Sequence, residues 1–330
     1  MIEYTDDVRQ VDWDKALLLY RGRGPFGADL TAGALREAVL GSSYAVFAME
    51  GGQVIGAARA ISDGDAWTFL SDVTVLPQYV GTDAEKELIR RVLERFHGHE
   101  IFTVTGRESL ELYEDLGFRR SRNGYTFEGY QGDVAIREPR AEYYLPLGYL
   151  YDTEQLSKES KPAGSGPAYR KSTKNLSPED VRYTADPEEV DFEQLNALLM
   201  RAFGGHPRDL ATTKRVFETS RYVSYAFLGE RLVGCARAVS DSRTQGLILN
   251  VAVDPDYQGL HIGLKVVELL GEQMKGQSVY LNTHPGAVGF YNRKPFLRNK
   301  TALLFPAHPD MPEEMAKGFM LPKGYRFPDE

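Results

Sequence analysis

The second half of the chain shows the clearest periods of hydrophobic and polar positions. Apolar residues recur at helical spacing over residues 190–203 and 207–220, which predicts two neighbouring helices. The apolar run of residues 247–253 is continuous, as expected of a central strand that is buried on both faces. The same criteria predict strands over 181–185, 222–229, 230–240, 278–283 and 300–305, an amphipathic helix over 264–274 and a short helix over 287–292.

This order of elements predicts an α/β fold. One strand, two helices, three strands, and then helix, strand, helix and strand are typical of an α+β arrangement around one mixed sheet. Gly229 and Glu230 lie between two predicted strands and favour a hairpin turn there.

The pattern occurs twice along the chain. Residues 44–81 align without a gap on residues 222–259, at a shift of 178 positions, and 14 of the 38 pairs are identical. The same shift pairs Tyr113 with Tyr291 and Phe118 with Phe296. Because chance does not preserve one register over such a length, we expect two tandem copies of one domain, related as a pseudo-twofold duplication.

The copies predict the domain boundaries. We expect an N-terminal domain over residues 1–150, a flexible linker over 151–180 and a C-terminal domain over 181–330. Gly, Pro, Ser and Lys dominate residues 157–176, and such a segment cannot bury enough apolar surface to fold alone. A chain of 330 residues is also long for a single core.

Composition limits the classes of function. The net charge of −8 argues against nucleic acid or an anionic membrane as the main partner and suits an amine substrate. No apolar stretch of about 20 residues predicts a membrane span. The single Cys235 excludes an intrachain disulfide and a multi-cysteine metal site. We therefore expect a cytoplasmic protein without a metal, either a monomer that forms an internal pseudo-dimer or a homodimer.

One segment of the second copy contains candidate residues for ligand binding. After the buried strand over 247–253, a loop that contains Gly259 and Gly263 opens the amphipathic helix. Glycines allow a ligand to approach the backbone closely, and the first amides of a helix are unpaired and carry partial positive charge. Together these features predict a cradle for a pyrophosphate.

At this point the chain resembles the GNAT superfamily of acetyl-CoA-dependent N-acetyltransferases. The family's loop, Gln/Arg-x-x-Gly-x-Gly/Ala, is matched by Gln258, His261 and Gly263, with His261 where glycine is usual. A later family element, a helical tyrosine followed by Gly-Phe, is matched by Tyr291 and by Pro295-Phe296, with proline in place of glycine. The resemblance covers most of both halves. The layout is similar to that of tandem GNAT proteins such as mycothiol synthase, in which one half is active.

The resemblance implies acetyl-CoA, or another acyl-CoA, as the acyl donor. Backbone groups of the central strand would pair with the pantetheine arm and face the thioester oxygen, and the loop would hold the pyrophosphate. The expected acyl-CoA contacts are Val251, Ala252, Val253, Gln258, Gly259, Leu260, His261, Ile262, Gly263 and Asn282.

The resemblance also implies roles in the reaction. Tyr291 would protonate the departing CoA thiolate, which is plausible for a phenol of pKa about 10 and a thiol of about 8.5. Asn282 would orient the acyl-CoA or a water molecule. His284 is a candidate base because imidazole titrates near neutral pH. Structural alternatives remain open: Tyr291 as a packed aromatic, Asn282 as a strand-end hydrogen bonder and His284 as a solvated loop residue. Cys235 is interpreted as inert core and not as a nucleophile.

The first copy lacks the features of the loop. Val80, Asp83 and Glu85 replace Gln258, His261 and Gly263. Carboxylates at the start of a helix stabilise the helix, but they repel a pyrophosphate. We therefore expect CoA to bind weakly or not at all in the first half.

The sequence thus predicts an N-acetyltransferase whose second half transfers acetyl to an amine of a small molecule by direct attack through a tetrahedral intermediate. Three alternatives remain open: a non-catalytic acyl-CoA-binding protein, a protein-lysine acetyltransferase, and an enzyme that transfers another acyl group or decarboxylates an acyl-CoA.

Overall fold

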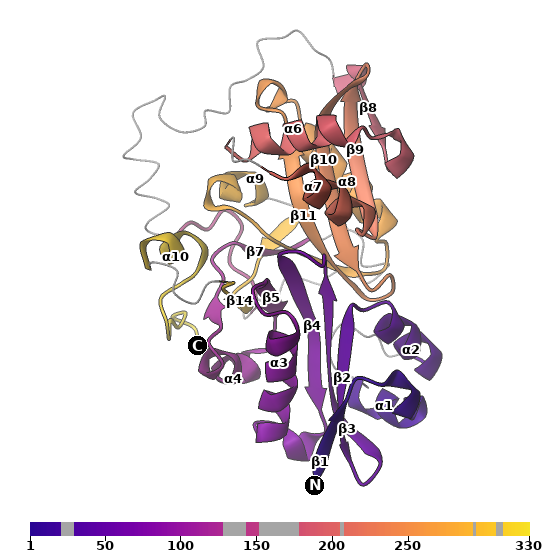
Figure 1. The fold of residues 1–330 in the computed structure, drawn as a ribbon. Helices are drawn as coiled ribbons and strands as arrows, with labels where there is room; N and C mark the ends of the chain where they lie inside the picture. Colours follow the sequence, from indigo (N-terminus) through magenta and orange to yellow (C-terminus); the bar gives the residue numbers. More distant parts are fainter. Residues whose placement is uncertain (21–29, 128–142, 152–177, 205–207, 293–294, 308–312) are drawn as a thin grey trace. The chain divides into compact units, whose positions relative to one another are not determined.

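A computed structural model describes residues 1–20, 30–127, 143–151, 178–204, 208–292, 295–307 and 313–330 (Figure 1). The described residues form two seven-stranded sheets with helices, so the predicted mixed α/β class is confirmed. The expected linker lies almost entirely outside the described residues. Contacts divide the chain into two compact units: residues 1–145, 239–247 and 276–330 form the first, and residues 146–238 and 248–275 form the second. The domain bounds near residues 150 and 180 stay predictions.

The first sheet lies wholly in the first unit. Its neighbours are antiparallel, except for β4 and β5, which pair in parallel over only three residues, from Trp67 opposite Glu100 to Phe69 opposite Phe102. The order of its strands is β1 (Ile2–Thr5), β2 (Tyr44–Glu50), β3 (Gln53–Ser62), β4 (Trp67–Val75), β5 (Glu100–Val104), β14 (Ala302–Phe305) and β6 (Arg119–Arg120).

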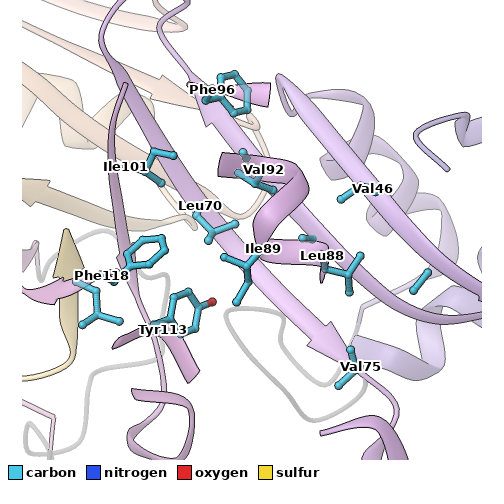
Figure 2. Packing of buried hydrophobic residues seen from close by; sticks show 14 of the residues in the cluster. Val46, Leu70, Val75, Leu88, Ile89, Val92, Phe96, Ile101, Tyr113 and Phe118 are labelled. Atoms are coloured by element: carbon cyan, nitrogen blue, oxygen red, sulfur yellow. The ribbon is translucent and has the colours of Figure 1, made fainter. Parts of the chain in front are cut away.

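The described helices of the first half are α1 (Trp13–Tyr20), α2 (Ala32–Leu40), α3 (Asp83–Arg95) and α4 (Leu110–Asp115). The helix α3 buries Leu88, Ile89 and Val92 against strand residues such as Val46 and Leu70, as Figure 2 shows. Each such aliphatic side chain contributes about 1.5–3 kcal/mol when it is fully buried. This core fixes the position of the loop that precedes α3.

The second sheet contains most of the strands that were predicted from the second copy. The predicted strand over 300–305 is instead β14 of the first sheet, so the expectation of a single sheet for this copy is wrong. Its order is β13 (Phe296–Arg298), β7 (Gly124–Phe127), β12 (Ser278–Asn282), β11 (Gln245–Val253), β10 (Arg231–Ser240), β9 (Tyr222–Leu228) and β8 (Val181–Thr184). The helices of the second half are α6 (Phe192–Ala202), α7 (Leu210–Glu218), α8 (Ile262–Gln273), α9 (Val288–Tyr291) and α10 (Glu313–Phe319). The predicted elements are confirmed, while β13 and α10 were not predicted.

Capping residues explain where two helices of the second unit begin. Asp191 accepts hydrogen bonds from the amides of residues 193 and 194 at the start of α6. Asp209 accepts from the amide of Thr212 at the start of α7. Both carboxylates satisfy amides that a helix leaves unpaired. The helices bury Leu195, Leu199 and Phe217 in a core with Tyr225 and Cys235.

The glycine that both copies share has a packing reason. A Cβ atom at Gly56 would lie 2.8 Å from Cγ1 of Val75 and 3.0 Å from Cδ1 of Leu88 on α3. At Gly234 it would lie 2.8 Å from Cγ2 of Ile262, the first residue of α8. In each copy a larger residue at this position would therefore force neighbouring side chains to shift, including one on the helix that follows the loop.

The last strand of each copy pairs with strands of the other copy. β7 belongs to the first copy and pairs antiparallel with β12 and β13 of the second. β14 belongs to the second copy and pairs antiparallel with β5 and β6 of the first. The shift of 178 positions that relates the copies superimposes β7 on β14, so the exchange is reciprocal. All six strands lie in the first unit.

Within the described residues, no helix has the length and apolar character needed to cross a bilayer.

Candidate functional site

The loop after β11 is held by Asp254. The amide of Asp254 donates to the carbonyl of Val233, and its Oδ1 accepts from the amide of Asp256. Its carboxylate, which is 2% exposed, also forms ion pairs with Arg201 at 3.0 Å and Arg231 at 2.9 Å. These contacts fix the chain at the point where it leaves the strand for α8.

The loop that opens α8 combines two left-handed residues with amides that have no acceptor among the described residues. Gly259 and His261 both adopt the left-handed region, with φ of +85° and +59°. In the described part of the chain, the backbone amides of His261, Ile262 and Gly263 donate to no protein acceptor, and no side chain caps this end of the helix. Unpaired amides at a helix N-terminus bind anions. The side chain of Gln258 donates to the carbonyl of Val253 at 3.3 Å.

His261 stands at a position that favours glycine. A positive φ is rare for residues with a Cβ atom and typically costs about 1–3 kcal/mol. His261 has this conformation and an exposed side chain. Glycine adopts this left-handed backbone without strain, which agrees with its usual presence at this place of the family's loop.

The corresponding loop of the first copy carries its own anion. Oε2 of Glu85 accepts a hydrogen bond of 2.8 Å from the amide of Gly81, and Glu85 is only 7% exposed. Glu85 and Asp83 both lie in the first turn of α3. The first copy thus keeps Gly81 at the place of Gly259 but has a carboxylate where the second copy has Gly263, and this negative charge repels a phosphate.

A left-handed residue interrupts β11 just before the predicted acyl-CoA contacts. Asn250 has φ of +49°, and its Oδ1 accepts a hydrogen bond of 2.6 Å from Nε of Arg237. Arg237 is 1% exposed. The buried arginine thus fixes the irregular residue at which the backbone of Val251, Ala252 and Val253 begins. The loop and these strand residues lie together in the second unit.

Asn282 ends β12 in the first unit. Its Oδ1 accepts a hydrogen bond of 2.7 Å from Oγ of Ser121. Its Nδ2 atom is buried and has no partner in the described part of the chain. The amide is thus held at its oxygen end and presents an unpaired donor. Ser121 was not predicted, because its contact with Asn282 depends on the strand exchange.

His284 caps a short helical turn. Its Nδ1 accepts a hydrogen bond of 3.1 Å from the amide of Gly286, and its ring contacts Phe319 edge-on with the ring centroids 5.5 Å apart. In the neutral ring this bond places the proton on Nε2. A role as base would require this bond to break, and it stays a prediction.

Tyr291 is the last residue of α9 and is 4% exposed. Its ring contacts Phe296 and Phe290 edge-on, with centroids 5.0 and 4.7 Å apart, and the ring of Tyr125 at 5.8 Å. The aromatic packing fixes the orientation of the phenol. Asn282, His284 and Tyr291 lie together in the first unit.

Cys235 is fully buried within β10, and burial raises the pKa of its thiol to about 12. A thiol with such a pKa carries no appreciable thiolate near neutral pH. Among the described residues, no cluster of three or more His, Cys, Asp or Glu side chains is arranged to hold a metal ion.

Comparison with known families gives two matches. Residues 192–296 match the Acetyltransferase (GNAT) family, and residues 22–132 match an Acetyltransferase (GNAT) domain. The two ranges together span more than half of the chain and fall on its two copies.

Individual relatives agree with these matches. Over 72 residues the chain is 35% identical to proteins from Pyropia yezoensis and Porphyra purpurea, each named "Uncharacterized N-acetyltransferase ycf52". The match covers 21% of this chain and 41% of each relative, so it spans less than half of their length. The crystal structure of a GCN5-related N-acetyltransferase from Sphaerobacter thermophilus is similar in fold, with 14% identity, a TM-score of 0.50, and coverage of 92% of this chain and 94% of that one.

Proposed function

Because both copies of the chain match the GNAT acetyltransferase family, to which the chain therefore belongs, we propose that the protein is an N-acetyltransferase whose second half transfers the acetyl group of acetyl-CoA to a primary amine of a small molecule. The observation that carries the proposal is the contrast between the two loops. The amides at the start of α8 are unpaired, whereas Glu85 fills the loop before α3. A diphosphate is attracted by the first arrangement and repelled by the second.

The acyl donor would bind along the residues that carry these features. The loop from Gln258 to Gly263 holds the diphosphate through its amides, and the backbone of Val251–Val253 pairs with the pantetheine arm. One strand amide faces the thioester oxygen and stabilises the oxyanion of the tetrahedral intermediate, a contribution of about 3–4 kcal/mol when one such donor is lost.

The reaction joins the amine to the acyl carbon. The neutral nitrogen attacks the thioester carbonyl, a C–N bond forms, and the C–S bond breaks as the intermediate collapses. The hydroxyl of Tyr291 gives its proton to the CoA thiolate. The substrate nitrogen loses a proton to solvent or to a base. The phenolate of Tyr291, which remains after the thiolate is protonated, regains a proton. His284 is the base candidate that the sequence offers, provided that its bond to the Gly286 amide opens.

The first half would not bind the acyl donor. The buried Glu85 supports this part of the proposal, since the carboxylate already binds the Gly81 amide. We further propose that the protein acts in the cytoplasm, as a monomer or homodimer, on a small amine and not on nucleic acid or membrane.

The reaction is tested by measuring thiol release from acetyl-CoA with a panel of primary amines, namely an amino sugar, a polyamine and a lysine peptide. The small amines are expected to release thiol and the peptide is not. Tyr291→Phe should lower turnover at least tenfold with little change in affinity for CoA, while Tyr113→Phe, at the equivalent and equally buried tyrosine of the first copy, serves as the control. Unchanged turnover in Tyr291→Phe would remove Tyr291 from the mechanism.

A further inference from the structure

The segment from Ser121 to Tyr125 belongs to the first copy, yet it lies against candidate residues of the second. The carbonyl of Asn123 accepts from the amide of Thr283 at 3.0 Å, and Gly124 lies opposite Asn282 in the β7–β12 register. The ring of Tyr125 packs against that of Tyr291. All of these residues lie in the first unit, so the strand exchange brings the first copy to the end of β12.

The hydroxyl of Ser121 has its donor and acceptor roles fixed by its surroundings. Its oxygen accepts a hydrogen bond of 3.1 Å from the amide of Asn123. A serine hydroxyl has a single hydrogen to donate, and its nearby acceptor is Oδ1 of Asn282 at 2.7 Å. Because Ser121 is 1% exposed, water does not compete for this contact.

This contact sets the orientation of the Asn282 amide. An asparagine can be turned so that either its oxygen or its nitrogen faces a neighbour. The hydroxyl of Ser121 has one hydrogen that needs an acceptor, and Oδ1 of Asn282 is the acceptor that it has in the structure, so this contact favours the oxygen on the side of Ser121. The nitrogen is then directed away from Ser121, and it is buried without a partner in the described part of the chain. A buried donor that is left unpaired destabilises a fold, so a ligand that accepts from it gains affinity.

We propose that Ser121 is a positioning residue for acyl transfer: it holds the Asn282 amide so that Nδ2 donates a hydrogen bond to a carbonyl oxygen of the bound acyl-CoA. Asn282 contacts the acyl donor, and Ser121 acts through Asn282. The proposal rests on the function given above and adds that the first copy, which does not itself bind the acyl donor, orients a group of the acyl-CoA site.

The test compares KM for acetyl-CoA, kcat and melting temperature among four single variants. Ser121→Ala is expected to raise KM about three- to tenfold, as the loss of one hydrogen bond implies, with a smaller change in kcat. Ser121→Thr, which keeps the hydroxyl, should restore KM. Ser71→Ala is the matched control, since Ser71 is also buried but donates to the carbonyl of Arg59. Asn282→Asp keeps an oxygen that accepts from Ser121 but removes the NH2 group, so it should raise KM for acetyl-CoA as Ser121→Ala does. This variant tests the inference even if Ser121→Ala does not fold.

A double variant separates positioning from simple packing. Ser121→Ala combined with Asn282→Ala should bind acetyl-CoA no more weakly than Asn282→Ala alone, because Ser121 acts only through Asn282. The inference would be overturned if the two substitutions weakened acetyl-CoA binding additively, or if Ser121→Ala had the same KM as Ser71→Ala. The proposed function would stand in either case. A wild-type protein that shows no acetyl-CoA binding in calorimetry would overturn both.

Discussion

Replacement of Asp241 should destabilise the first unit, because this carboxylate belongs to a buried ionic network. Oδ2 of Asp241 lies 2.9 Å from Nη1 of Arg59, and both side chains are fully buried. Oδ1 accepts hydrogen bonds from the amides of Arg243, Thr244 and Gln245 at 2.9, 2.7 and 3.1 Å. Arg59 comes from the first copy and Asp241 from the second, so the network joins segments that are 182 positions apart within this unit.

The contacts set the expected magnitude. Asp241→Ala leaves a buried guanidinium with one carboxylate fewer and removes the acceptor of three amides. Removal of one partner from a buried ion pair costs about 3–5 kcal/mol. Arg59 keeps its ion pair with Asp72 at 2.8 Å, so we expect the lower part of that range. Asp241→Asn keeps one oxygen for the three amides, but its NH2 group then faces Nη1 of Arg59 and cannot accept from it, so the bond to Arg59 is lost. This variant should destabilise the unit less than Asp241→Ala does, because the amides keep their acceptor.

Urea unfolding measures these losses. Both tryptophans, Trp13 and Trp67, lie in the first unit, so their fluorescence reports on this unit. The control is Asp115→Ala, since Asp115 forms an exposed ion pair with Lys86 and its loss should cost less than about 1 kcal/mol. If Asp241→Ala and Asp115→Ala unfold at the same urea concentration, the buried network does not stabilise the unit as argued.

Three further outcomes follow from the structure. Burial alone would raise the pKa of Asp241, but Arg59 and the hydrogen bonds from Thr244 and the Arg243 amide outweigh burial and lower this pKa. The stability that this carboxylate contributes is therefore present above pH about 4 and lost on acidification. Asp241→Asn should flatten this part of a curve of stability against pH. Cys235 should resist alkylation at pH 8 in the native protein and react in urea, as mass spectrometry can show; rapid native labelling would contradict its burial. A fragment of residues 181–330 lacks β7 and should show no cooperative unfolding by circular dichroism unless residues 1–150 are co-expressed; a fragment that unfolds cooperatively alone would show that the exchange is dispensable.

Local patterns in the sequence predicted the elements well, because hydrophobic period and turn residues are properties of neighbouring positions. The apolar run that became β11 and the glycine loop before α8 are examples. The contrast between Gly263 and Glu85 was also visible in the sequence. The structure adds that the carboxylate of Glu85 binds the loop amide, a contact that depends on a side-chain rotamer.

The strand exchange could not be predicted in the same way. β7 and β14 occupy equivalent positions in the two copies, so the pattern of each strand fits the sheet of either copy. The choice between them is made by long-range pairing, which a periodicity analysis does not detect. Ser121 was missed for this reason, since its contact with Asn282 exists only after β7 has joined the sheet of the second copy.

The most direct test of the loop contrast is a calorimetric titration of CoA into the full chain and into Gly263→Glu. Gly33→Glu is the control, because it adds the same charge at an exposed position of α2, where a Cβ atom would lie 3.9 Å from Oγ1 of Thr31, an ordinary contact. The wild type and Gly33→Glu are expected to bind one CoA per chain, and Gly263→Glu none. Two sites of similar affinity in the wild type, or undiminished binding in Gly263→Glu, would contradict the assignment of the acyl-CoA site to the second half.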